Sequence, residues 1–167
     1  ISTIFINTNL AACGGVVVAA IVPRLLSGKT DVIMMLNGAI GGLVAITAEP
    51  LAPSPLAAIL IGGVGGLIVV FGTKLLFVWK IDDVVGAIPA HLFAGIWGTL
   101  AVPLTNVDAS FGAQLIGVFA INIFVFIISL VIWGIMKNTV GIRLSKEAER
   151  LGTDVAETGV IAYAIRD

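Results

Sequence analysis

The chain has 167 residues, of which 59% are hydrophobic and 11% charged, and its mean hydropathy of +1.14 is too high for a water-soluble domain. Its formal charge of −1 is not arranged as a basic face, which excludes a nucleic-acid partner. One cysteine, Cys13, excludes an internal disulfide. The composition therefore predicts an all-α integral membrane protein.

Five apolar stretches are long enough, or nearly so, to cross a hydrocarbon core of about 30 Å as helices. They cover residues 1–22, 32–48, 56–78, 84–104 and 111–136. We expect residues 1–140 to form the transmembrane region and residues 141–167 to form a cytoplasmic tail. The first residue is Ile, so we also expect the sequence to start part-way through a longer protein.

The second and third stretches are rich in glycine, which would break a helix in water. Small residues let helix backbones approach closely in a membrane, so we interpret these glycines as packing positions. An odd number of spans suits half of an inverted-repeat transporter with one additional helix.

The basic residues predict the orientation, because short loops that carry Lys and Arg stay in the cytoplasm. They lie in or beside the first and third of the segments that connect the stretches, and after the fifth stretch, whereas the second and fourth connecting segments have none. These residues are Arg24, Lys29, Lys74, Lys80, Lys137, Arg143, Lys146, Arg150 and Arg166. The start of the chain should therefore lie outside and the tail inside.

The fourth stretch holds the one histidine of the chain, His91. Ala94 and Gly98 lie close to His91 on a helical wheel, so we expect the imidazole to face protein and not lipid. Asp82 and Asp83 precede this helix and should cap its positive end. Pro89 removes one backbone donor and leaves a carbonyl free near the histidine.

An ionisable side chain in hydrocarbon points to a function, since its presence there costs free energy. A neutral imidazole has one donor and one acceptor, enough to order a small polar solute or to pass a proton. The alternative is a histidine that hydrogen-bonds a neighbouring helix for packing alone. We interpret four further polar residues as helix-to-helix hydrogen-bonding groups: Asn7, Asn9, Asn37 and Asn122.

Enzyme chemistry is not indicated. One histidine and one cysteine without a nearby carboxylate make no metal site. The sequence also lacks a glycine-rich phosphate loop and a nucleophile with a partnering base, so we expect neither a cofactor nor an enzyme.

The tail changes composition abruptly to charged residues. Ser145 followed by KEAER predicts a short helix capped by the serine hydroxyl. A charged tail of this kind is usually solvated, which leaves a binding role open.

Three blocks of sequence resemble the ammonium transporter (Amt/Mep/Rh) family in its C-terminal half. They are LNGAIGGLVAITA at 36–48, DDVVGAIPAHLFAGIWGTLAV at 82–102 and GIRLSKEAERLGTDVAETG at 141–159, followed by Ala162 and Tyr163. The tail positions that match the family pattern are Gly141, Arg143, Glu147, Glu149, Gly152, Asp154, Glu157 and Gly159.

The resemblance implies that the five stretches are helices seven to eleven of an eleven-helix fold. It also implies that His91 is the second of two histidines in a narrow hydrophobic pore for ammonium and ammonia. The family further implies a homotrimer in the plasma (inner) membrane, in contact with lipid, and a PII-type regulator on the cytoplasmic face. Thr158 departs from the family pattern, because many members have histidine there.

Two alternatives to a transporter stay open at this point. The same membrane module could serve as an ammonium sensor, or transceptor, without appreciable flux. It could also be a structural membrane subunit in which the helices serve only for packing.

Overall fold

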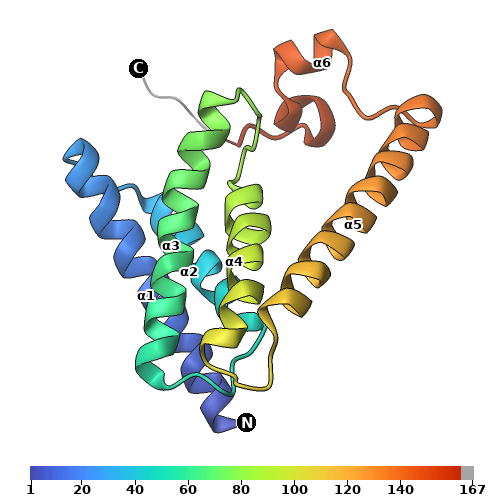
Figure 1. The fold of residues 1–167 in the computed structure, drawn as a ribbon. Helices are drawn as coiled ribbons and strands as arrows, with labels where there is room; N and C mark the ends of the chain where they lie inside the picture. Colours follow the sequence, from blue (N-terminus) through green and yellow to red (C-terminus); the bar gives the residue numbers. More distant parts are fainter. Residues whose placement is uncertain (163–167) are drawn as a thin grey trace. The chain divides into compact units, whose positions relative to one another are not determined.

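The computed structural model describes residues 1–162, and this part of the chain is helical without a β-strand (Figure 1). The elements in order are α1 (Ser2–Ser27), α2 (Val32–Thr47), α3 (Pro55–Val78), η1 (Ile88–Phe93), α4 (Ala94–Ala101), η2 (Val102–Leu104), α5 (Phe111–Thr139), α6 (Lys146–Leu151) and η3 (Asp154–Thr158). The predicted all-α class is confirmed. Residues 1–121 form one compact unit and the residues from Asn122 onward form a second, and each is described by itself.

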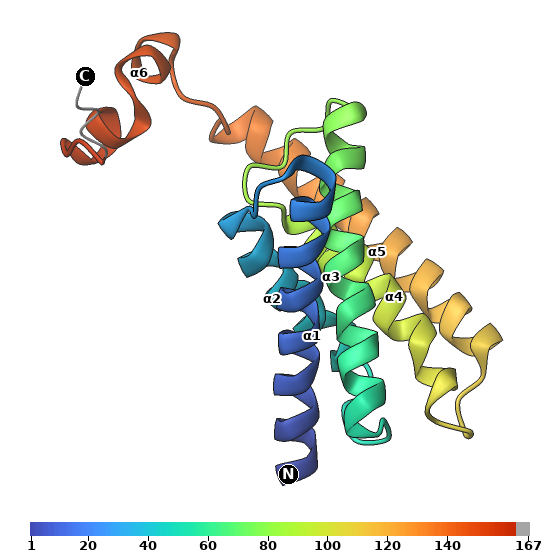
Figure 2. The ribbon, with the colours of Figure 1, turned by 90° about the vertical axis from the view of Figure 1, so that its left-hand side faces the viewer.

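The core of the first unit is formed by α1, α2 and α3, with η1 and α4 packed against α2 and α3 (Figure 2). The three helices approach so closely that a methyl group has no room at several glycines. A Cβ atom on Gly15 would overlap the carbonyl oxygen of Gly38, and one on Gly62 would overlap that of Ala11. The predicted packing role of these glycines is therefore confirmed.

Polar side chains fix the ends of these helices. The Asp31 carboxylate accepts a hydrogen bond from the Met34 amide (3.0 Å) at the start of α2, and the Ser54 hydroxyl accepts one from the Ala57 amide (3.3 Å) at the start of α3. Gly28, with a φ of 75°, ends α1 in the left-handed conformation that glycine adopts without strain.

Asn7 and Asn9 do not make the helix-to-helix hydrogen bonds that the sequence predicted. The buried amide of Asn7 donates to the carbonyl oxygens of Pro50 (3.0 Å) and Pro53 (2.8 Å), and so ties α1 to the loop between α2 and α3. The amide of Asn9 donates to Phe5 in its own helix (2.9 Å). Residue type alone could not distinguish these partners from a neighbouring helix.

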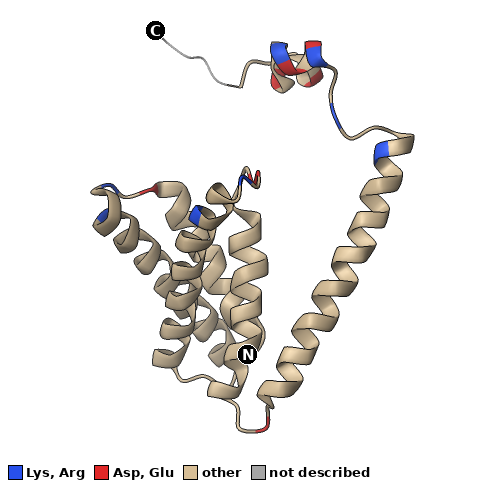
Figure 3. Ribbon diagram, turned by 45° about the horizontal axis from the view of Figure 1, so that its top comes forward, with Lys and Arg blue, Asp and Glu red and all other residues tan. Residues whose placement is uncertain are grey.

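Three helices, α1, α3 and α5, are long and apolar enough to cross a membrane, whereas the apolar segments Val32–Thr47 and Ile88–Leu104 are shorter. Within residues 1–121 the charged side chains lie in loops or close to helix ends (Figure 3). This arrangement keeps charge away from the middle of the helices, as a hydrocarbon environment requires.

Candidate functional site around His91

A capped turn comes before His91. The two carboxylate oxygens of Asp83 accept hydrogen bonds from the amides of Ala87 (2.9 Å) and Ile88 (2.8 Å). Gly86 lies between Asp83 and these two amides, and its φ of 72° lies in the left-handed region. Asp83 therefore caps the helical segment as predicted, but η1 begins at Ile88 and not at residue 84.

Pro89 leaves one carbonyl without a helical partner, and the structure shows which group replaces it. Proline has no N–H, so the carbonyl of Val85 cannot receive the usual bond from the residue four positions later. The side-chain amide of Asn37 on α2 donates to this oxygen instead (2.8 Å). Asn37 therefore joins α2 to the turn before η1, and not to another helix as the sequence predicted.

Gly86 also makes room for this side chain. A Cβ atom at position 86 would lie 2.6 Å from the Asn37 amide nitrogen. The left-handed turn and the close approach of the amide therefore both require glycine at this position.

His91 lies in a π-helical turn, where the amide of Ala94 reaches the carbonyl of Pro89 five residues earlier. π-helical turns are rare in proteins overall, and those that occur are often found at functional sites. The π turn was not predicted from the sequence. Pro89 was the available signal, because a missing donor favours a local change of hydrogen-bond register.

The side chain of His91 is exposed on the surface of this chain, although Ala90 and Ala94 on either side of it are buried. Exposure on this chain does not show whether protein or lipid lies beside the imidazole, so the expectation that His91 faces protein stays a prediction. Within residues 1–162 the imidazole has no hydrogen-bond partner.

The geometry thus combines a fixed backbone with a free side chain. Asp83, Asn37 and Gly86 hold the turn, and the imidazole presents its donor and acceptor to whatever lies beside this face. A metal site is not formed, since no group of three or more His, Cys, Asp or Glu residues gathers within the described residues.

The tail forms a small folded element of its own around α6. The Ser145 hydroxyl accepts a hydrogen bond from the Ala148 amide (3.2 Å), which confirms the predicted capped helix. Arg143 binds Glu149 through two hydrogen bonds, from Nε to Oε1 (2.5 Å) and from Nη2 to Oε2 (3.0 Å). The hydrogen bond from Arg143 lowers the pKa of the Glu149 carboxyl.

Asp154 holds the segment that follows α6. Its carboxylate accepts a hydrogen bond from the Ala162 amide (2.8 Å), and this bond, with one from the Val155 amide, lowers the pKa of Asp154. Gly152 precedes it with a φ of 101°, and a Cβ there would lie 2.7 Å from an Asp154 carboxylate oxygen.

The structure thus brings Arg143 to Glu149 and Gly152 to Asp154 among the predicted tail residues. Gly141, with a φ of 84°, lies in the turn after α5, and Glu147 lies in the first turn of α6. Tyr163 and Arg166 lie outside the described residues.

A family model described as Ammonium Transporter Family matches residues 1–163. The chain belongs to the ammonium transporter family. Among its relatives, the ammonium transporter Amt2 of Archaeoglobus fulgidus is 38% identical over 98% of this chain and 39% of its own length. The ammonium transporter of Bacillus subtilis is 34% identical over 95% of this chain and 43% of its own length.

Solved structures of the family agree with the fold. A protein titled "Sensor Amt Protein" superimposes with a TM-score of 0.86 at 27% identity, over 94% of this chain and 42% of that one. The crystal structure of Candida albicans Mep2 gives a TM-score of 0.78 at 27% identity, over 95% of this chain and 40% of that one. The chain therefore spans about two fifths of the length of these transporter-family proteins and is a partial version of a larger fold.

Proposed function

We propose that this chain contributes to the ammonium-conducting pathway of a transporter and that His91 contacts the solute there. The observation that carries the proposal is the placement of His91: a π turn held by Asp83 and Asn37 presents the imidazole outward, without a partner among residues 1–162. A histidine used only for packing would be expected to bind a neighbouring helix.

The chemistry follows from desolvation. An ammonium ion loses much of its hydration energy in an apolar passage, whereas neutral ammonia loses far less. The neutral imidazole of His91 can accept a hydrogen bond from ammonia or donate one to it, and it can take part in moving the released proton. The other histidine of the pair that the family resemblance implies would have to come from outside this chain, since His91 is its one histidine.

The charge distribution supports an orientation with the start of the chain outside and the tail in the cytoplasm. We place the protein in the plasma (inner) membrane, as a homotrimer in contact with lipid. The five helical segments then correspond to helices seven to eleven of the family fold.

Replacing His91 by Ala in the complete protein tests the pore assignment. Uptake of methylammonium should be abolished or change its ion discrimination, because the passage loses its hydrogen-bonding group, while insertion and assembly stay normal. Asn9→Ala is the matched control, since Asn9 bonds only within its own helix and should leave uptake unchanged. Normal uptake and normal discrimination in His91→Ala would contradict the proposal.

A sensor without appreciable flux is the second candidate, and one observation favours it: the structure titled "Sensor Amt Protein" matches this chain with a TM-score of 0.86. The two functions differ in flux. Ammonium binding by the purified complete protein together with negligible uptake in vesicles would support the sensor, and uptake that His91→Ala removes would support the transporter.

We further propose that the tail regulates transport by contact with a PII-type protein. The folded arrangement of Arg143, Glu149, Gly152 and Asp154 supports a recognition surface more than a merely solvated tail. Deleting residues 141–167 should reduce or deregulate transport more than it reduces expression. Unchanged transport and regulation after the deletion would contradict this proposal and indicate that residues 141–167 are only a solvated tail.

A further inference from the structure

A side-chain hydrogen bond joins α4 to α3 beyond the turn that carries His91. The indole N–H of Trp97 on α4 donates to the carbonyl oxygen of Ile61 on α3 (3.0 Å). Trp97 is half-buried, and it packs against the core of the first unit, to which Ile61 and Ala45 belong. Water is absent from the hydrocarbon region of a membrane, so no water competes there for the indole N–H.

The next residue, Gly98, joins α4 to a different helix. A Cβ atom at this position would overlap the carbonyl oxygen of Ala45, so the backbones of α4 and α2 are in contact there. Two neighbouring residues thus connect α4 to both helices behind it, Trp97 to α3 by a hydrogen bond and Gly98 to α2 by packing. Packing on a glycine leaves room for a small slide, whereas a hydrogen bond depends on distance and angle. Trp97 therefore sets the position of this part of α4 more sharply than Gly98 does.

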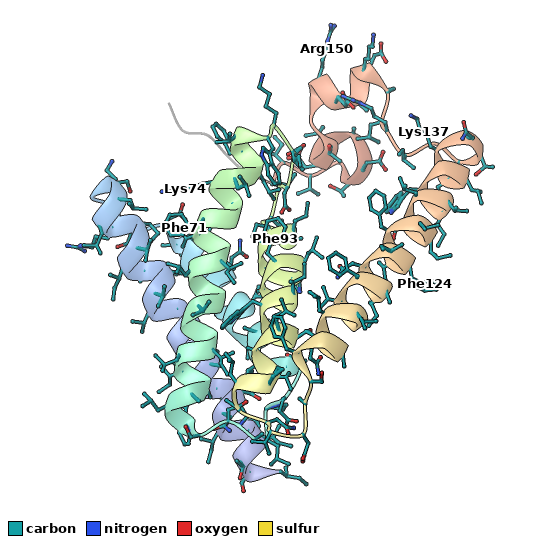
Figure 4. The ribbon with its side chains drawn as sticks, in the orientation of Figure 1. Phe71, Lys74, Phe93, Phe124, Lys137 and Arg150 are labelled. Carbon is teal, nitrogen blue, oxygen red and sulfur yellow. The ribbon has the colours of Figure 1, made fainter. Side chains whose placement is uncertain are left out.

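The turn that carries His91 is also held on its other side. The amide of Asn37 on α2 donates to the carbonyl oxygen of Val85 before the turn (2.8 Å). Within the turn, Phe93 packs on α3, where a Cβ on Gly72 would lie 2.8 Å from its ring (Figure 4). The π turn is therefore attached to the neighbouring helices both before and after the imidazole.

Attachment on both sides matters because a π turn can change its register. Its hydrogen bonds span five residues where those of an α-helix span four, so the turn holds one residue more than an α-helical turn does. If one side were free, the segment could return to α-helical hydrogen bonds, and the residues on that side would move by one position. The side chains in the turn would then point in a different direction.

We infer that Trp97 is a positioning residue for His91: its hydrogen bond to Ile61 keeps the π turn in register and so sets the direction of the imidazole. Trp97 acts through the backbone of η1 and α4 and not by contact with the solute. This inference rests on the proposed function of His91 in the pathway, and its experiments are chosen so that the two can fail separately.

Two replacements of Trp97 in the complete protein remove the N–H: Trp97→Phe, and benzothienylalanine, which keeps both rings with sulfur in place of the N–H. Amide exchange of residues 90–96 should become about fivefold faster in both, because one hydrogen bond of ordinary strength changes the ratio of two conformations by about that factor. Exchange in α1 should stay unchanged. Unchanged exchange of residues 90–96 would overturn the inference, and so would an equal acceleration in α1, since the bond would then serve general stability only.

Transport supplies the second measurement. Methylammonium uptake per inserted protein, and its discrimination against K⁺, should change in both Trp97 variants in the same direction as in His91→Ala but less far. Trp79→Phe is the matched control, because Trp79 is exposed at the end of α3 and its indole makes no hydrogen bond within residues 1–162. Normal transport in the Trp97 variants, where His91→Ala alters it, would overturn this inference alone. Normal transport in His91→Ala would contradict the proposed function instead, and the exchange experiment would still decide whether Trp97 holds the turn.

Discussion

Single side chains decide how the turn around His91 is held. The side-chain amide of Asn37 donates the hydrogen bond that Pro89 cannot donate. This bond joins α2 to the segment that precedes η1. Without this donor the carbonyl of Val85 would depend on water or remain unpaired. The position of the imidazole therefore depends on a residue 54 positions earlier in the chain.

We expect Asn37→Ala to lower the free energy of unfolding by about 1 kcal/mol, the usual net contribution of one hydrogen bond. Amide exchange of residues 86–93 in the complete protein should become faster, because the turn loses its anchor on α2. Asn9→Ala should have no such effect, since that amide bonds only within α1. Identical exchange in the two variants would show that Asn37 does not hold the turn.

The sequence was informative about polar residues whose partners are local. Asp83 and Ser145 cap the segments that follow them, as their spacing predicted. It was less informative about partners far away along the chain: Asn7 binds a loop more than forty residues later. The π turn at His91 was not predicted either, because a pattern counted at 100° per residue does not contain it.

At the scale of elements, α1 and α3 pack with their backbones in contact. Gly62 faces the backbone of Ala11, and Gly66 faces that of Gly15. Contacts of this kind give close van der Waals packing in a membrane, where the hydrophobic effect between helices is absent. The glycine-rich pattern predicted such an interface, although not which pairs meet.

Gly62→Ala should therefore destabilise the complete protein by about 1 to 3 kcal/mol, because the new methyl group forces the two backbones apart. Gly117→Ala is the matched control: nothing within the described residues lies within 4 Å of a Cβ at that position, so it should leave stability nearly unchanged. Thermal unfolding in detergent measures both. A melting temperature for Gly62→Ala equal to that of the control would contradict the close packing.

The pair of Arg143 and Glu149 makes α6 sensitive to acid. The hydrogen bond from Arg143 lowers the pKa of Glu149 below its ordinary value of 4.5, so the pair stabilises the folded tail above that pH. The stabilisation is lost as the pH falls through the lowered pKa. Between pH 7 and pH 5 we therefore expect no loss of protection in residues 146–151, and below that range a progressive loss.

Hydrogen exchange, corrected for the intrinsic rate at each pH, measures this protection. Glu149→Gln keeps the size of the side chain and removes its titration, so protection in this variant should be low and should not fall further on acidification. A variant with the same acid response as the unmodified protein would exclude Glu149 as the titrating group.

At the scale of the whole molecule, the basic residues predict one topology for the chain. Lys29 and Asp108 lie in exposed loops that the positive-inside rule assigns to opposite sides of the membrane. Cysteines at these two positions, in a complete protein whose Cys13 is replaced by Ser, should react differently with a membrane-impermeant thiol reagent applied from outside intact cells.

We expect labelling of Asp108→Cys and protection of Lys29→Cys until the membrane is made permeable. The reverse pattern would invert the orientation. Labelling of both before permeabilisation would mean that α2 or its neighbours do not cross the membrane. The experiment is informative for α2 because this helix is shorter than α1, α3 and α5.

Helices and their order were readable from hydropathy, because five apolar stretches are separated by clear breakers. The start of the helical segment around His91 was not readable from hydropathy, since Gly86 and the Asp83 cap hold residues 84–86 outside the helix. The family also became apparent from sequence, through three blocks that the family comparison confirmed. The role of His91 stays a prediction, because no group within residues 1–162 binds its imidazole and so none indicates what it contacts.

The glycine contacts have a consequence for how this protein can evolve. At Gly62 the opposing atoms belong to the backbone of Ala11, so no exchange of side chains on α1 can make space for a larger residue at 62. At Gly72 the opposing atoms are side-chain carbons of Phe93 and Pro89, at 2.8 and 3.0 Å from a Cβ. A second-site suppressor such as Phe93→Leu can thus restore a Gly72→Ala variant, whereas a Gly62→Ala variant has no such route back.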